Sequence, residues 1–139
     1  MVLSNNDGCV VARSNEAKAL KIPMAAPFFK FKDFFIQHKV NVFSANFSLY
    51  GDLSNRVMDT LAGFTPDIEI YSIDEAFLKI PEHIDSLDKL YEFGWKIRNK
   101  VLKDVGIPVS IGISTTKTLA KLGSHIAKSK FCSSLKNGE

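Results

Sequence analysis

Hydrophobic residues recur along the first half of the chain at spacings that predict short strands separated by helices. Ser14 is a residue type that commonly caps helices, and Pro27 fits the first turn of a phenylalanine-rich helix. A longer apolar stripe, spaced i, i+3, i+7 and i+11 from Tyr50, ends before Gly63 and Pro66. The predicted elements are a strand at 10–12, helices at 14–20 and 27–38, a strand at 41–45 and a helix from Asn46.

The second half is expected to open with a hairpin and to close with a strand and a helix. Two apolar runs, at 67–71 and 75–80, are near enough in sequence to form a tight antiparallel pair. Asp85 is expected to cap the helix that follows, which ends at Gly106. The remaining predicted features are a strand at 109–113 and a last helix capped by Ser114, Thr115 or Thr116, with an apolar stripe of Leu119, Leu122 and Ile126.

This order of elements favours an α+β fold, because a hairpin interrupts the alternation of strands and helices. A ferredoxin-like βαββαβ core can be drawn through 41–130, with a mixed or antiparallel sheet, a central hairpin and covering helices. The length of 139 residues fits a single domain, and the polar tail at 131–139 is expected to fray.

Composition narrows the class of protein. Apolar residues make up 45% and charged residues 24%, as in globular rather than disordered chains. No apolar run approaches the ~20 residues of a membrane span, and no basic-then-apolar segment at Met1 indicates export. Cys9 and Cys132 form no metal-type pair, so a reducing, cytoplasmic setting is expected.

The net charge is +3, and the charged residues are unevenly distributed along the chain. Residues 1–50 carry six Lys and Arg against three Asp and Glu, residues 51–99 carry five against ten, and residues 100–139 carry seven against two. Such runs are often solvated surfaces. They would equally suit an acidic centre for cations between basic flanks for a polyanion.

The most informative stretch is Ser72-Ile73-Asp74-Glu75-Ala76-Phe77, where two adjacent carboxylates interrupt an apolar strand pair. One interpretation is a polar turn with both carboxylates solvated. The other is a Mg²⁺ site, because this cation commonly takes one or two carboxylates together with substrate phosphates. Neighbouring strand residues point to opposite faces, so Asp74 and Glu75 could share a metal only if the chain bends there.

Two lysine-rich groups are candidate phosphate contacts. Lys117 and Lys121 lie at i, i+4 near the start of the last helix, and Arg13, Lys18 and Lys21 surround the first helix. Both groups could simply be solvated basic faces. Together with a carboxylate pair, they are the components of phosphoryl transfer, in which the protein supplies positioning, metal and charge.

Several short sequence blocks, occurring in a fixed order along the chain, resemble those of a known protein family. They are Leu3 to Arg13, Glu16 to Leu20, Phe43-Ser44, Asn46, Leu49-Tyr50, Ser54-Asn55-Arg56-Val57-Met58, Glu69 to Phe77, Gly112-Ile113 and Thr116 to Leu122. The chain resembles the Y-family DNA polymerases that copy damaged templates, and within them the UmuC branch, which holds the catalytic subunit of bacterial polymerase V.

The resemblance implies a palm domain, with the start of a partial fingers-like segment in 1–40. It implies that Asp74 and Glu75 bind two catalytic Mg²⁺ ions and that Lys18 and Lys117 hold the triphosphate of the incoming nucleotide. Arg13 and Asn15 would lie near that triphosphate, and Lys121 is a further candidate for DNA or phosphate contact. Many relatives have Arg at the position of Lys18 and Tyr at that of Asn15, so the bidentate fork and the aromatic contact are lost here.

The family's first strand, which carries another metal-binding Asp, precedes the block at Val2, so we expect the chain to be a fragment of an error-prone polymerase. The fragment alone is expected to be inactive and to self-associate through an open sheet edge. For the parent, the resemblance implies transfer of deoxynucleotides to a primer opposite damaged template in the SOS response.

The resemblance also implies partners, which are primer–template DNA, dNTP, a UmuD-type subunit, a recombinase filament and a sliding clamp. The expected location is the cytoplasm, at the nucleoid. The alternative is a non-catalytic DNA-repair accessory or scaffold that retains the palm fold. A nucleotidyl cyclase on a similar core would be expected to have a glycine-rich hairpin, which this sequence lacks.

Overall fold

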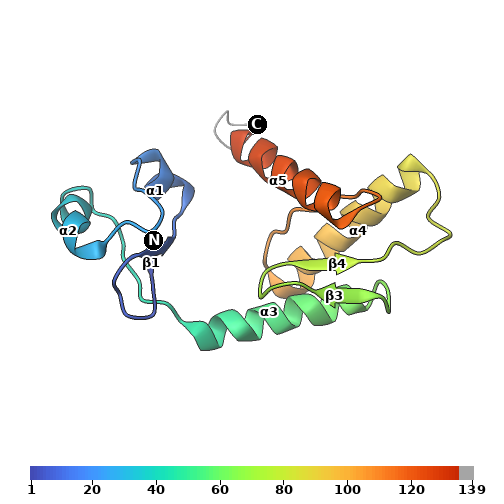
Figure 1. The fold of residues 1–139 in the computed structure, drawn as a ribbon, viewed down its shortest axis with the longest axis horizontal. Coiled ribbons are helices and arrows are strands. Elements are labelled where there is room, and N and C mark those ends of the chain that lie inside the picture. Colours follow the sequence, from blue (N-terminus) through green and yellow to red (C-terminus); the bar gives the residue numbers. More distant parts are fainter. Residues whose placement is uncertain (135–139) are drawn as a thin grey trace. The chain divides into compact units, whose positions relative to one another are not determined.

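The computed structural model describes residues 1–134, with side chains up to residue 129. The chain divides into two compact units, Met1–Phe47 and the part from Ser48 onward. Each unit has its own helices and its own two-stranded antiparallel sheet (Figure 1). Within the described residues, no helix combines the length and the apolar character that a membrane crossing requires.

The first unit contains strands β1 (Val2–Leu3) and β2 (Val10–Ala12) and helices α1 (Asn15–Ala19) and α2 (Phe28–Gln37). The predicted strand at 41–45 is reduced to one parallel bridge, between Phe43 and Val2. The Leu3 N–H donates to the Phe43 carbonyl at 2.8 Å. Because β1 is only two residues long, it offers too short an edge for a full third strand.

Apolar side chains from α1, α2 and both strands form the core of the first unit. Ser14 caps α1 as predicted, since its hydroxyl accepts the Ala17 N–H at 3.3 Å. On α2 the Phe35 ring is almost fully buried and stacks against two neighbouring phenylalanines. The buried residues of this core are Met1, Leu3, Val10, Ala17, Ile22, Ala26 and Phe35.

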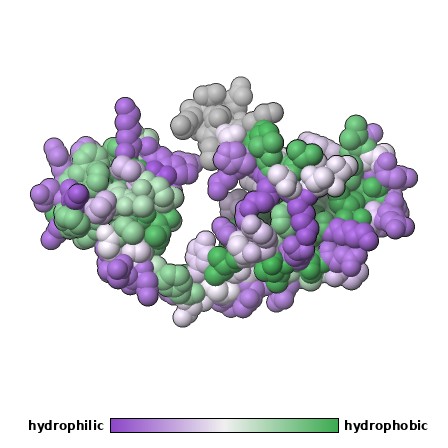
Figure 2. Space-filling view, in the orientation of Figure 1, coloured by the Kyte–Doolittle hydropathy of each residue, from purple (hydrophilic) through white to green (hydrophobic). Residues whose placement is uncertain are grey.

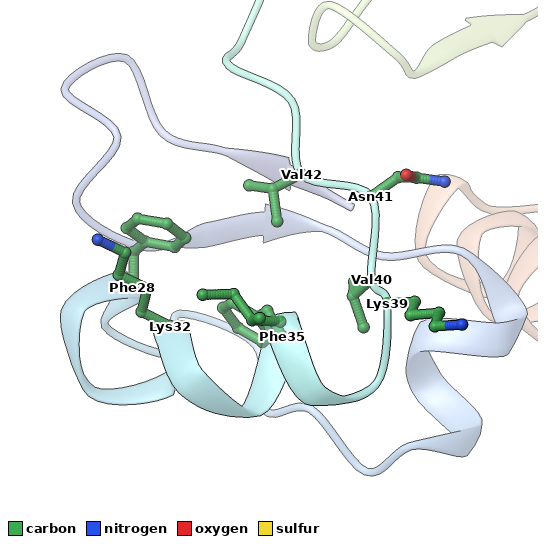
Figure 3. A pocket seen from close by; sticks show the side chains of 8 residues that line it. Phe28, Lys32, Phe35, Lys39, Val40, Asn41 and Val42 are labelled. Atoms are coloured by element: carbon green, nitrogen blue, oxygen red, sulfur yellow. The ribbon is translucent and has the colours of Figure 1, made fainter.

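A cavity of about 290 Å³ lies between α2 and the segment after it (Figure 3). Phe28, Phe35, Val40 and Val42 make much of its lining apolar. Figure 3 shows the side-chain nitrogen of Lys39 pointing away from these apolar groups. A second cavity, of about 420 Å³ in the second unit, is lined by residues 80–90 and 113–115. Neither of these two cavities is lined by a predicted site residue.

The second unit contains helix α3 (Phe47–Ala62), strands β3 (Ile68–Ile70) and β4 (Ala76–Leu78), and helices α4 (Leu87–Val105) and α5 (Lys117–Ser134). The predicted hairpin is confirmed, with Glu69 opposite Phe77 in an antiparallel register. Figure 1 shows α3 running alongside this hairpin. The α+β class and the central hairpin are therefore as predicted.

Helix α4 begins one residue later than predicted. Ser86, not Asp85, is its cap, because the Ser86 hydroxyl accepts the Lys89 N–H at 3.3 Å. Asp85 instead pairs with the Lys89 ammonium at 2.7 Å, and this hydrogen bond lowers the pKa of Asp85. Gly106 ends the helix in the left-handed conformation, with φ 78°, as its position predicted.

The predicted strand at 109–113 is not a strand, because no described strand pairs with it. This segment packs between two helices instead. A Cβ atom on Gly112 would lie 2.1 Å from the Ala120 carbonyl oxygen of α5, and Ile113 reaches to 3.4 Å from the Cβ position of Gly94 on α4. The Ser124 hydroxyl of α5 donates to the Ser110 carbonyl at 3.1 Å. Alternating apolar residues thus fill a helix interface rather than a sheet.

The apolar stripe predicted on the last helix lies largely in contact with solvent. Leu119, Leu122 and Ile126 are 50%, 55% and 46% exposed. Figure 2 shows hydrophobic patches over α4 and α5. The α5 helix extends to Ser134, so the first part of the predicted frayed tail is helical, and 135–139 lie outside the described residues.

We predict that Gly112→Ala lowers the free energy of unfolding by about 2 kcal/mol or more, because the added methyl group meets the backbone of α5. Gly51→Ala is the matched control. Gly51 lies in α3 with nothing within 4 Å of the new methyl group, so alanine should stabilise the helix by about 0.5–1 kcal/mol. Urea unfolding followed by Trp95 fluorescence measures both. Equal effects of the two substitutions would show that the close approach at Gly112 is not a constraint.

Candidate functional site

The two predicted metal ligands lie in a bend, here called the carboxylate turn (residues 71–75). The N–H groups of Tyr71 and Ser72 both donate to the Glu75 carbonyl at 3.0 Å, which closes the hairpin. Residues 72–74 are bent, and neither Asp74 nor Glu75 is part of a strand. The alternation of side chains along a strand therefore does not separate the two carboxylates.

The carboxylates differ in their partners although both are exposed. The Ser72 hydroxyl donates to Asp74 Oδ1 at 2.7 Å, and within the described part of the chain Asp74 has no ion pair. Glu75 Oε2 lies 3.0 Å from the Lys121 ammonium. No described Lys or Arg pairs with both carboxylates, which leaves Asp74 accessible to a cation.

The first turns of α5 place two lysines on one face of the hairpin, and each lysine contacts one ring and one carboxylate. Lys117 pairs with Glu69 and lies 5.5 Å from the centroid of the Phe77 ring. Lys121 pairs with Glu75 and lies 4.4 Å from the centroid of the Tyr71 ring. Ammonium groups within about 6 Å of an aromatic ring are attracted to its face. The predicted phosphate-binding lysines therefore face hairpin carboxylates in this structure.

The carboxylate turn raises the pKa of Lys121. The main cause is the hydrogen bond to Glu75. Desolvation, the next largest effect, lowers the pKa of Lys121, and the charges of Glu75, Tyr71 and Asp74 raise it further. Lys121 thus keeps its charge to a higher pH than an unpaired lysine. Any stabilisation that it provides is present below its ordinary pKa and is lost as the pH rises through the raised value.

The other predicted site residues belong to the first unit. Lys18 is exposed in the last turn of α1, and none of the described carboxylates pairs with its ammonium group. Asn15 is the exposed first residue of α1. Arg13 is half-buried, and its Nη1 donates to the Ile22 carbonyl at 2.5 Å. Arg13 therefore ties the segment after α1 to the strand before it.

The donor set of the carboxylate turn fits a magnesium ion that shares its coordination with another ligand. Among the described residues there is no group of three or more His, Cys, Asp or Glu that could hold a metal. Two carboxylates remain at the turn, Asp74 and Glu75. Mg²⁺ is commonly bound through one or two carboxylates plus phosphate oxygens and water, rather than by a cage made of protein alone.

Sequence reasoning did not single out three side chains that shape this site. Glu69 pairs with Lys117, the Ser72 hydroxyl bonds Asp74, and Ser54 of α3 donates to the Ile73 carbonyl within the carboxylate turn. Ser54 stands in one of the blocks that carry the family resemblance. Nothing in the hydrophobic pattern distinguishes it from a solvated serine on a helix.

We predict that Glu75→Gln lowers the pKa of Lys121 toward its ordinary value, because the neutral amide removes the main cause of the shift. An NMR titration of the lysine side-chain resonances measures the change. Glu92→Gln, on the exposed surface of α4, is the matched control and should leave the Lys121 titration unchanged. An identical Lys121 titration in the two variants would contradict the pairing.

Comparison with known proteins gives the context of this site. Residues 1–125 match the impB/mucB/samB family (IMS). Protein UmuC of Salmonella typhimurium is 52% identical over 128 residues, which are 92% of this chain and 30% of UmuC. DNA polymerase IV 2 of Mesorhizobium japonicum is 35% identical over 121 residues, 87% of this chain and 29% of that protein. The chain thus spans about 30% of the length of these relatives.

Comparison with solved structures agrees with these sequence matches. A ternary complex of Dbh, with partially disordered substrates, superimposes with a TM-score of 0.78 at 26% identity, over 89% of this chain and 37% of the Dbh chain. The fold class and the resemblance to Y-family polymerases of the UmuC branch are confirmed. With residues 1–125 matched and UmuC 52% identical, this chain belongs to the impB/mucB/samB family.

Proposed function

We propose that this chain is the palm-region part of an error-prone translesion DNA polymerase, which adds deoxynucleotides to a primer end opposite damaged template. The carboxylate turn carries the proposal. It carries the consecutive residues Asp74 and Glu75, both exposed, on a hairpin that two helices contact. The similarity to a protein named DNA polymerase IV 2 and to a polymerase ternary complex supports the same reaction.

In the proposed site, Asp74 and Glu75 would hold Mg²⁺. When bound, such ions lower the pKa of an attacking hydroxyl and neutralise charge on a triphosphate. The chain's own contribution is orientation. The Ser72 hydroxyl directs one oxygen of Asp74, and Glu75 would exchange its contact with the Lys121 ammonium for one with the cation.

The proposed contacts to the nucleotide are polar and basic side chains in or just before α1 and in the first turns of α5. Lys18, exposed and without a described carboxylate partner, would meet the triphosphate, with Asn15 and Arg13 beside it. Lys117 and Lys121 would contact phosphate after release from Glu69 and Glu75. Both ion pairs are more than 40% exposed, so their opening costs little free energy.

One observation favours a second candidate function, a non-catalytic accessory or scaffold in DNA repair. Lys117 and Lys121 already neutralise two hairpin carboxylates, Glu69 and Glu75, so among the described residues only Asp74 of the carboxylate turn is left without an ion pair. In that case Glu69 and Glu75 would serve only to anchor α5, and Asp74 would be a solvated turn residue.

The proposal extends to the substrates, location and partners of the whole protein. The whole protein would act on primer–template DNA and dNTP in the cytoplasm, at the nucleoid, during the SOS response. A UmuD-type subunit, a recombinase filament and a sliding clamp are the proposed partners, and the similarity to UmuC supports them.

We predict that the chain binds Mn²⁺, used as a probe for Mg²⁺, and that Asp74→Asn weakens this binding at least about tenfold. Electron paramagnetic resonance of free Mn²⁺ during a titration measures the affinity. Asp59→Asn, at an exposed position of α3, is the matched control and should bind as the unsubstituted chain does. Mn²⁺ binding that both substitutions leave unchanged would support the scaffold alternative.

We predict that the isolated 139-residue chain shows no template-dependent primer extension with Mg²⁺ or Mn²⁺. The chain spans about 30% of its relatives, and positioning of both substrates by the rest of such a protein supplies a large part of catalysis, about 7–11 kcal/mol in well-oriented reactions. A primer-extension assay tests this, with Asp74→Asn as the control. Extension that disappears in the control would show that these residues are sufficient for the reaction.

A further inference from the structure

The carboxylate turn is tied to helix α3 by one side chain. The Ser54 hydroxyl, half-buried on α3, donates a hydrogen bond to the Ile73 carbonyl. Ile73 is the residue directly before Asp74, and its carbonyl lies in the bend, outside the β3–β4 ladder. The ladder therefore supplies no partner for this carbonyl, and α3 does.

This bond acts on Asp74 through the peptide group between the two residues. The Ile73 carbonyl and the Asp74 N–H belong to one rigid plane. Ser54 holds the carbonyl side of the plane, and on the other side the Asp74 N–H lies 3.4 Å from the Ser72 hydroxyl, a long and weak contact. Of these two contacts with the peptide plane the Ser54 bond is the stronger, so Ser54 constrains the orientation of the plane and with it the direction in which the Asp74 side chain leaves the backbone.

A second hydroxyl on the same helix behaves differently. Thr60 donates to the Arg56 carbonyl of its own helix at 2.8 Å, the usual bond of a hydroxyl residue within a helix. Ser54 instead donates across to the turn. The Thr60 hydroxyl therefore makes a hydrogen bond within its own helix, whereas the Ser54 hydroxyl makes one to the hairpin.

We propose that Ser54 is a positioning residue, whose hydroxyl holds the carboxylate turn in the conformation that directs Asp74 and Glu75 to a common cation. This inference rests on the proposed metal-binding function of those two residues. Partners that orient metal ligands without touching the metal commonly change its affinity about 10- to 100-fold when they are removed.

The experiment compares Mn²⁺ affinity in the full chain and in three variants, together with urea unfolding of each. Ser54→Ala should weaken Mn²⁺ binding about tenfold. Ser54→Thr keeps a hydroxyl on the same carbon atom and should restore affinity to within about twofold. Thr60→Ala removes the hydroxyl of α3 that does not reach the turn and should bind as the unsubstituted chain does.

A spectroscopic readout distinguishes positioning from general stability. The amide ¹⁵N resonance of Asp74 reports the hydrogen bond of the preceding carbonyl, so it should move in Ser54→Ala and stay in place in Thr60→Ala. If Ser54→Ala does not fold, Ser54→Cys replaces it, because the thiol fills the same position as a weaker donor.

The outcomes separate this inference from the function on which it rests. Mn²⁺ binding that depends on Asp74 but is equal in Ser54→Ala and the unsubstituted chain would overturn the role of Ser54 and leave the metal site standing. An absence of Asp74-dependent Mn²⁺ binding in the unsubstituted chain would overturn both. If Thr60→Ala loses as much Mn²⁺ affinity as Ser54→Ala does, the positioning role of Ser54 would also be overturned. The loss of affinity would then be an effect of changing α3 in general.

Discussion

Side-chain contacts from two helices hold the hairpin β3–β4, and the position of the two adjacent carboxylates depends on them. Each strand is three residues long, and an isolated hairpin of this size is marginally stable in water at best. Ser54 of α3 holds the turn, while Lys117 and Lys121 of α5 contact one face of the strands. The candidate site is therefore a product of helix packing rather than of the sheet.

Steric fit more than charge decides where α5 lies. Exposed ion pairs contribute little and are screened by salt, so the contacts of Lys117 and Lys121 could not fix a helix by themselves. The backbone at Gly112 approaches α5 so closely that a Cβ atom would meet the Ala120 carbonyl. Ala120 directly precedes Lys121, which pairs with Glu75. The close packing of Gly112 against α5 thus fixes the helix in a position from which the Lys121 ammonium reaches the carboxylate turn.

Local signals in the sequence predicted the hairpin and the helix limits at Ser14 and Gly106. They could not predict whether an extended segment finds a partner. The alternating apolar residues of 109–113 are typical of a strand, yet they pack between α4 and α5, because pairing depends on residues far away in the sequence. The choice of Ser86 over Asp85 as a cap is likewise geometric, since both residue types are good caps. Ser54 was hidden for the same reason, because its partner is a backbone carbonyl that no pattern marks.

The pairing of Glu75 with Lys121 bears on how a cation could enter the proposed site. A divalent cation and the Lys121 ammonium would compete for the same carboxylate, because a lysine is charged over the physiological range and the raised pKa of Lys121 extends its charge to higher pH. With two carboxylates and one nearby ammonium, the turn supplies a net charge too small to hold Mg²⁺ tightly without further anionic ligands. Phosphate oxygens would supply that charge and would also give Lys121 a new partner. In the proposed site, cation and phosphate therefore each strengthen the binding of the other, and by linkage the effect is equal in both directions.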